Sequence, residues 1–232
     1  GVTGGYVHQV VRLIGDDEKL ESLNLGVAIP TDACRVVVQE GVNSQLLGAD
    51  PEYVAADLLS QAEHDPNAGS VLITDSPELA DAVDAALERR LSETRHRERA
   101  STALRGPQSG TVLVRDLTQA IEVADAYAAE HLEIHTSDAP QVARRIRNAG
   151  AIFIGPYSPV PLGDYLAGSN HVLPTGGTAR FAAGLSVMAF LKPVQLIEYS
   201  ANALEAMTPA LEVLARCEDL PAHGEAARAR RQ

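Results

Sequence analysis

The sequence has few cysteines and no long apolar segment, and both shortages narrow the classes of protein to which it can belong. Among 232 residues there are two cysteines, Cys34 and Cys217, which lie far apart and form no Cys-x-x-Cys pair. A disulfide scaffold is therefore not expected, and a reducing cytoplasm is the default compartment. No apolar run approaches the roughly 20 residues that a membrane helix needs. We find no basic-then-apolar leader of the kind that predicts secretion.

Basic side chains are also scarce relative to acidic ones. The sequence has 19 Lys and Arg against 31 Asp and Glu, a formal net charge of −12. A surface this acidic argues against binding nucleic acid or an anionic membrane through bulk electrostatics. Hydrophobic residues make up 45% of the chain and charged residues 22%, the ordinary composition of a globular protein with a real core.

Helical and strand patterns alternate regularly from about residue 51. Apolar residues recur at helical spacing in several segments, which are 51–62, 76–95, 116–124, 139–147 and 201–216. Short buried-strand patterns lie between or before them, at 35–39, 70–74, 111–114, 131–135 and 151–154. This alternation predicts an α/β fold with a mostly parallel sheet and crossover helices.

We expect two parts, an α/β domain over 1–195 and a small helical C-terminal tail over 196–232, whose end frays from Glu225. Within the first part, residues 155–178 break the alternation and are crowded with Gly, Pro, Ser, Asn and Asp. A loop of this length inside a compact domain is usually functional or disordered. Residues 1–50 are the hardest part of the sequence to interpret.

Two pairs of polar residues lie at the ends of predicted elements. Gln61 and His64 are three apart at a helix end, so they share a face and could bind one ion, although a solvated helix end explains them better in isolation. Glu130 and His131 lie between a helix and a strand. A carboxylate beside an imidazole suits proton transfer, but a surface pair explains these two residues equally well.

Two further pairs lie in irregular segments. Asp164 and His171, in the long loop, offer oxygen and nitrogen ligands that zinc accepts. We favour a functional interpretation of this loop, because a solvated linker would not need so many apolar residues between its polar ones. Glu218 and His223 follow the last predicted helix, and by themselves they are typical of a polar chain terminus.

Taken together, these segments resemble the histidinol dehydrogenase family in order and approximate spacing. The matching segments are Asp57-Leu-Leu-Ser-Gln-Ala-Glu-His64, Ala129-Glu-His-Leu-Glu-Ile134, Gly163-Asp-Tyr-Leu-Ala-Gly-Ser-Asn-His-Val-Leu-Pro-Thr175 and Leu220-Pro-Ala-His223, with Gly176-Gly-Thr-Ala-Arg-Phe181 and Phe190-Leu-Lys192 continuing the match. The third segment is highly specific, and the resemblance covers residues 49–223.

The resemblance implies a Rossmann-like fold of the aldehyde-dehydrogenase kind and a cytoplasmic oxidoreductase of histidine biosynthesis. Members oxidise L-histidinol through the aldehyde to L-histidine with two NAD molecules. One zinc ion per subunit would orient the substrate, with the ligands Gln61, His64, Asp164 and His223. His131 would be the general base, and Glu130 would activate the water of the second oxidation. The substrate-binding residues would be Gln61, His64, His131, Asp164, His171, Glu218 and His223.

The resemblance also implies a homodimer in which the C-terminal tail of each subunit completes the partner's active site. Glu218 and His223 would then act across the interface, which explains functional residues so near the end of the chain. The 1–195 domain would carry the metal and acid–base residues, and the 196–232 tail would serve dimerisation.

The sequence departs from the family pattern in its first fifty residues. Family members are roughly twice as long, and the opening Gly1-Val-Thr-Gly-Gly-Tyr-Val7 is an altered form of the family's Gly-Pro-Gly-Asn-x-Tyr-Val. No Gly-x-Gly-x-x-Gly turn replaces it, so the residues that bind NAD remain unassigned. Without an initiator methionine, the start suggests a trimmed sequence. The alternatives are a degenerate relative that binds zinc and an imidazole ligand without turnover, or a subunit that needs a separate N-terminal half.

Overall fold

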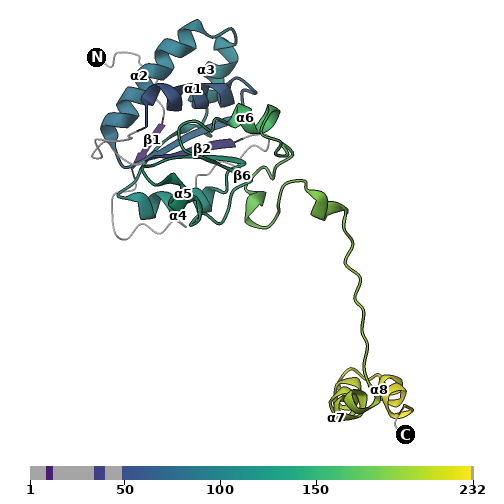
Figure 1. Cartoon of the computed structure of the whole chain (residues 1–232). Helices are drawn as coiled ribbons and strands as arrows, with labels where there is room; N and C mark the ends of the chain where they lie inside the picture. The colour runs from purple at the N-terminus through teal and green to yellow at the C-terminus, as the bar shows by residue number, and fades with distance from the viewer. Residues whose placement is uncertain (1–8, 13–33, 40–48, 231–232) are drawn as a thin grey trace. The chain divides into compact units, whose positions relative to one another are not determined.

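The computed structural model describes residues 9–12, 34–39 and 49–230 (Figure 1). The chain divides into two compact units, Gly1–Ala189 and Phe190–Gln232, which are treated separately below. Most of the divergent stretch 1–50 lies outside the described residues. The division into a catalytic domain ending at residue 195 and a dimerisation tail stays a prediction.

The first unit is built on one six-stranded sheet in which every described pairing is parallel. The strand order is β1-β4-β3-β2-β5-β6. The strands are β1 (Gln9–Arg12), β2 (Cys34–Gln39), β3 (Gly69–Thr74), β4 (Gly110–Leu113), β5 (His131–His135) and β6 (Ala151–Ile154). The sheet confirms the predicted α/β class, since parallel neighbours require crossover connections.

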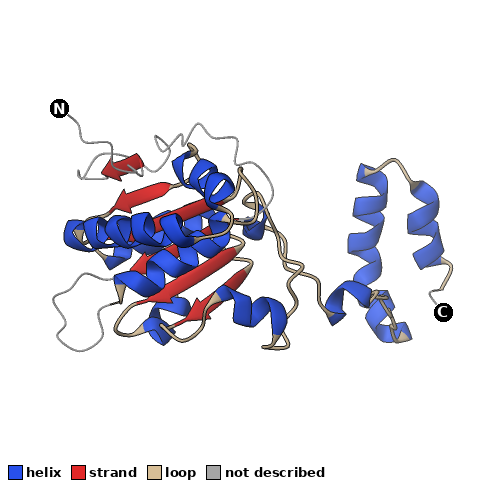
Figure 2. Cartoon of the chain, turned by 90° about the horizontal axis from the view of Figure 1, so that it is seen from above, coloured by secondary structure: helices blue, strands red, loops and turns tan. Residues whose placement is uncertain are grey.

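Helices cover both faces of this sheet (Figures 1 and 2). One face carries α1 (Pro51–Ala62), α2 (Pro77–Glu93) and α3 (Arg97–Arg105), and the other carries α4 (Leu117–Tyr127) and α5 (Ala139–Ala143). Each face has its own apolar core: Leu72 of β3 packs with α1–α3, whereas its neighbours Val71 and Ile73 pack with α4 and α5. Because successive side chains of a strand point to opposite faces of the sheet, neighbouring residues enter different cores.

The sequence encodes the starts of most of these helices locally. At four of them an acidic or hydroxyl N-cap side chain accepts a hydrogen bond from a backbone N–H one turn into the helix, and three of the four caps are followed by a proline. The caps are Asp50, Ser76, Asp116 and Asp138. These signals explain why the predicted helix starts agree with the structure to within a residue or two.

Some elements differ from those expected. The segment predicted as a loop over 155–178 contains a short helix, α6 (Val160–Tyr165), and α5 ends four residues earlier than expected. Helix α3 was not expected, because its buried face is only Ala100, Ala103 and Leu104. Residues 225–228, where fraying was expected, belong to helix α8 (Pro221–Arg228).

The second unit is a pair of helices, α7 (Ala201–Cys217) and α8, whose contact surface is small. The residues that this pair buries are Thr208, Ala215, Gly224 and Ala227. Most larger apolar side chains of the unit are exposed, including Leu196 at 94% and Ile197 at 81%. By itself, this unit therefore buries little of its apolar surface. No helix within the described residues has the length and apolar character to cross a membrane.

Asp84 on α2 makes the stability of the first unit depend on pH. Burial raises the pKa of its carboxyl to about 6, and repulsion from Asp81 and Glu88 adds to the shift. The folded state therefore binds this proton more tightly than the unfolded chain does. The stability that protonated Asp84 contributes is fully present below the pKa of this group in the unfolded chain, near 3.8. It is lost as the pH rises through about 6, the pKa in the folded protein.

Replacing Asp84 with Asn should remove this part of the pH dependence. We expect Asp84→Asn to raise the free energy of unfolding at pH 7.5 by about 1 kcal/mol, a value discounted because the side chain is partly in water. Urea unfolding of both proteins between pH 4 and 8 measures the effect. Parallel stability curves over that range would contradict it.

Candidate active site

Strand β5 presents three polar side chains on one face of the sheet. His131, Glu133 and His135 alternate with Leu132 and Ile134, and all five residues are buried. Leu132 and Ile134 enter the core beneath α4 and α5. The polar three face the opposite side, where α1 and α6 contribute Asp57 and Asp164. A buried strand face with three ionisable residues costs solvation free energy and is a strong sign of a functional site.

His131, at the start of β5, lies between two carboxylates. Its Nδ1 is 3.8 Å from Oε2 of Glu130, and its Nε2 is 3.9 Å from Oδ1 of Asp164. The side chains of His131 and Glu130 are about 10% exposed or less, whereas Asp164 keeps 24%. This arrangement can accept a proton on the imidazole, because the flanking negative charges stabilise the imidazolium.

Two glycines allow the close packing around this group. A Cβ on Gly163 would lie 2.6 Å from Cε1 of Phe153, whose ring centroid is 6.1 Å from that of His131. A Cβ on Gly150 would lie 2.6 Å from the carbonyl oxygen of Glu130. Both separations are shorter than a side chain tolerates. Gly163 therefore lets α6 approach β6, and with it Asp164 approaches His131.

The crossover topology explains why residues distant in sequence meet here. A helix that connects parallel strands runs back toward their amino ends. Helix α1 connects β2 to β3 in this way, so its last turn, which is followed by His64, lies toward the amino ends of the strands. Asp164, on α6, contacts His131 at the start of β5.

The structure groups some of the predicted site residues and separates others. It brings Glu130, His131 and Asp164 together. Gln61 is buried, and its Nε2 has no hydrogen-bond partner among the described residues, while His64 and His171 are exposed. Glu218 and His223 belong to the second unit, where both line a hollow of about 260 Å³. The zinc-ligand and substrate roles of these residues stay predictions.

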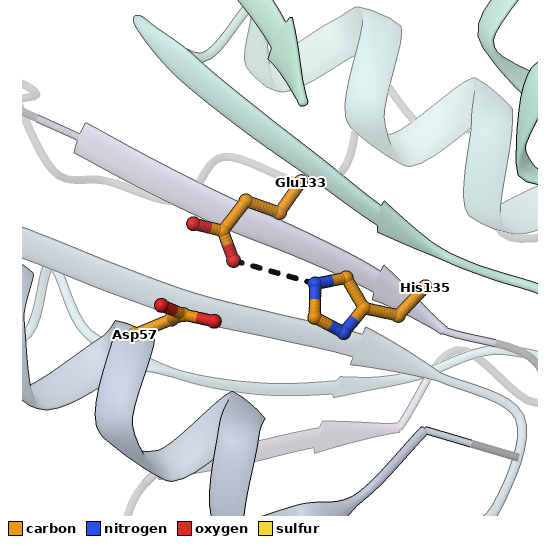
Figure 3. A group of neighbouring side chains, drawn as sticks. All are labelled: Asp57, Glu133 and His135. Carbon is orange, nitrogen blue, oxygen red and sulfur yellow. Dashed lines mark ion pairs between the residues drawn. The ribbon is translucent and has the colours of Figure 1, made fainter. Parts of the chain in front are cut away.

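The sequence analysis missed one cluster, formed by Asp57, Glu133 and His135 (Figure 3). One potential ligand atom from each residue lies within 4.8 Å of the others, and all three side chains are buried. A signal for it was present in the sequence. Glu133 and His135 are two apart on a predicted strand and so share a face, and Asp57 precedes Gln61 by one helical turn.

The chain is thus a parallel α/β protein with a buried imidazole between two carboxylates at the start of β5. The histidinol dehydrogenase family model matches residues 45–231. The chain belongs to the histidinol dehydrogenase family, as its resemblance indicated.

Individual relatives agree with the family match. A histidinol dehydrogenase of Nocardia farcinica is 62% identical over 178 residues, which are 77% of this chain and 40% of that protein. One from Mycobacterium tuberculosis is 62% identical over 182 residues, covering 78% of this chain and 41% of that protein. The crystal structure of histidinol dehydrogenase from Elizabethkingia anophelis superposes with a TM-score of 0.77 at 31% identity, covering 85% of this chain and 44% of that one. The chain thus spans about two fifths of the length of these relatives.

Gly163 is the residue whose substitution tests the packing around His131. We expect Gly163→Ala to destabilise the first unit by about 1–3 kcal/mol, because the new methyl group must displace the Phe153 ring. Urea unfolding measures the loss. In a Phe153→Leu background the same change should cost clearly less, since the smaller side chain vacates the space. An equal cost in both backgrounds would show that contact with Phe153 is not the cause.

Proposed function

We propose that this chain carries the metal-binding, substrate-binding and proton-transferring part of an NAD-dependent histidinol dehydrogenase, acting in the cytoplasm in histidine biosynthesis. The observation that carries the proposal is the position of His131 between Glu130 and Asp164. These residues come from segments far apart in the sequence. The family assigns their counterparts to proton transfer and to zinc.

In the first oxidation, His131 accepts the hydroxyl proton of L-histidinol. We assign this step to Nε2, because that nitrogen faces Asp164 and the predicted substrate side of the site. Glu130 faces Nδ1 and stabilises the imidazolium that forms. His131 would hold this proton, and bound NAD would supply the acceptor for the hydride of the carbon that carries the hydroxyl group.

In the second oxidation, water must add to the aldehyde before another hydride can leave. Glu130 is the proposed base for this water, since its carboxylate is largely buried and adjacent to His131. A second NAD would supply the hydride acceptor that converts the hydrated aldehyde to L-histidine. His171 and Glu218 are proposed to contact the substrate during both steps.

Gln61, His64, Asp164 and His223 are the residues that would bind zinc. Their amide oxygen, two imidazole nitrogens and one carboxylate form a mixed donor set that zinc accepts while leaving room for substrate. The buried side chain of Gln61, whose Nε2 lacks a partner among the described residues, fits a role in which its amide oxygen serves as a ligand. When bound, the ion would fix the imidazole and amine of the substrate.

The second unit is proposed to act on a partner subunit. Its helices α7 and α8 bury little of their apolar surface in each other, and Leu196, Ile197 and Leu214 are largely exposed. Burial of this surface in a second copy of the chain would offset that exposure and bring Glu218 and His223 to the partner's site.

The activity experiment measures NADH production from L-histidinol with zinc and NAD, alongside zinc content and histidinol binding. We expect His131→Ala to lower the rate by about 10²–10⁴-fold with zinc content unchanged. His64→Ala should lose the zinc ion that Gln61, His64, Asp164 and His223 would hold. His96→Ala is the matched control, because His96 lies at the start of α3 outside the site. Zinc and histidinol binding without turnover would favour the degenerate or two-subunit alternative, and no zinc uptake at all would refute the site.

Mixing two defective variants tests whether the tail acts across the dimer. Gln61→Ala and His223→Ala should each lose the zinc ion of this site when studied alone. If His223 serves the partner's site, random heterodimers of the two variants contain one intact site each, and the zinc bound at this site should return to about a quarter of its wild-type amount. Co-refolding followed by metal analysis measures this. Absence of recovery in proven heterodimers would mean that His223 acts within its own chain.

A further inference from the structure

We propose that Asp57, Glu133 and His135 form a second cation site, which takes a divalent first-row transition metal ion. The site shares no residue with the proposed zinc ligands and does not depend on the proposed function. Asp57 comes from the middle of α1, whereas Glu133 and His135 come from β5 (Figure 3). The ion would therefore connect a helix to the strand that carries His131.

The spacing of the three side chains matches the bond lengths of such an ion. His135 Nε2 lies 3.6 Å from Oε2 of Glu133, beyond the range of a hydrogen bond. Two bonds of about 2.1 Å at a tetrahedral angle separate their ligand atoms by about 3.4 Å. The ligand atoms of all three residues lie within 4.8 Å of one another, so an ion between them requires only small rotations of the side chains.

Burial and donor chemistry favour a metal ion at this place. Asp57 is 9% exposed, Glu133 0% and His135 4%. A divalent ion offsets the charges of two carboxylates and leaves the imidazole neutral, as a metal ligand must be. Nδ1 of His135 has no hydrogen-bond partner among the described residues, so this nearly fully buried ring is not fixed by a structural hydrogen bond there. Two oxygen donors and one imidazole suit Zn²⁺ or Mn²⁺.

The two carboxylate oxygens of Glu133 have different partners. Oε1 accepts a hydrogen bond of 3.3 Å from the backbone N–H of Val160, at the start of α6. Oε2 remains directed toward His135. An ion at the site would thus fix the carboxylate that anchors α6, and α6 carries Asp164. The inferred role is structural: the ion stabilises the packing of α1, β5 and α6 behind His131.

A cavity borders this cluster at the carboxyl end of β5, whereas His131 lies at the amino end of the same strand. A cavity of about 280 Å³ is lined by His135 and Thr136 at the end of β5 and by Ile154 and Gly155 at the end of β6. Carboxyl ends of parallel strands are the usual ligand-binding edge of open α/β sheets. His135 is thus the member of the cluster that lines this cavity, and none of the proposed zinc ligands lines it.

The test is metal uptake in a His64→Ala background, where the proposed zinc site is already disabled. Equilibrium dialysis of the full chain against Zn²⁺ or Mn²⁺, followed by elemental analysis, should give one ion per chain. Adding Glu133→Gln or His135→Gln, both close to the original side chains in size, should reduce uptake by at least tenfold. His96→Gln in the same background is the matched control and should retain the ion.

A second readout separates loss of the ion from loss of the fold. Zn²⁺ should raise the melting temperature of the His64→Ala protein but not that of His64→Ala/His135→Gln, while circular dichroism without metal should be the same for both. If Glu133→Gln prevents folding, Asp57→Asn replaces it. The proposal is overturned if the His64→Ala protein takes up no ion. It is also overturned if uptake persists in the variants at Asp57, Glu133 and His135. Uptake of one ion by both the wild-type and the His64→Ala proteins, lost on His135→Gln, would leave this proposal standing and refute only the zinc assignment.

Discussion

The opposite orientation of alternate residues along β5 is the constraint on which the rest of the site depends. Leu132 and Ile134 must enter the apolar core beneath α4 and α5, and this fixes His131, Glu133 and His135 on the other face. Strand β5 is flanked by β2 and β6, and helices cover that face of the sheet in place of water. The packing of helices on the sheet, which stabilises it, therefore buries the ionisable residues as well.

These buried polar residues contact groups from other parts of the chain. Glu133 binds the backbone of Val160 and so anchors α6, and α6 in turn brings Asp164 to His131. Gly163 permits this approach because the Phe153 ring occupies the space that a side chain would need. The acid–base group and the Asp57–Glu133–His135 cluster are thus two ends of one polar layer between β5 and the helices above it.

The sequence predicted the parts of this architecture that local signals determine. Capping residues such as Ser76 and Asp116, followed by apolar residues at helical spacing, marked helices α2 and α4. The run from His131 to His135 was recognised as a strand, and Glu130 and His131 as a candidate proton-transfer pair. Helix α6 was missed because its sequence, Val-Pro-Leu-Gly-Asp-Tyr, contains a proline and a glycine, and its position depends on Glu133 and Phe153.

By itself the sequence determined the α/β class, the family, and the order of most helices and strands but not α3 or α6, since these follow from hydrophobic periodicity, caps and motifs of neighbouring residues. Only the tertiary structure decided that Asp164 lies beside His131, and that Asp57, Glu133 and His135 form one buried cluster. The physical reason is that such contacts join residues dozens of positions apart, and their distances are set by how helices pack on a sheet. No local pattern encodes that packing.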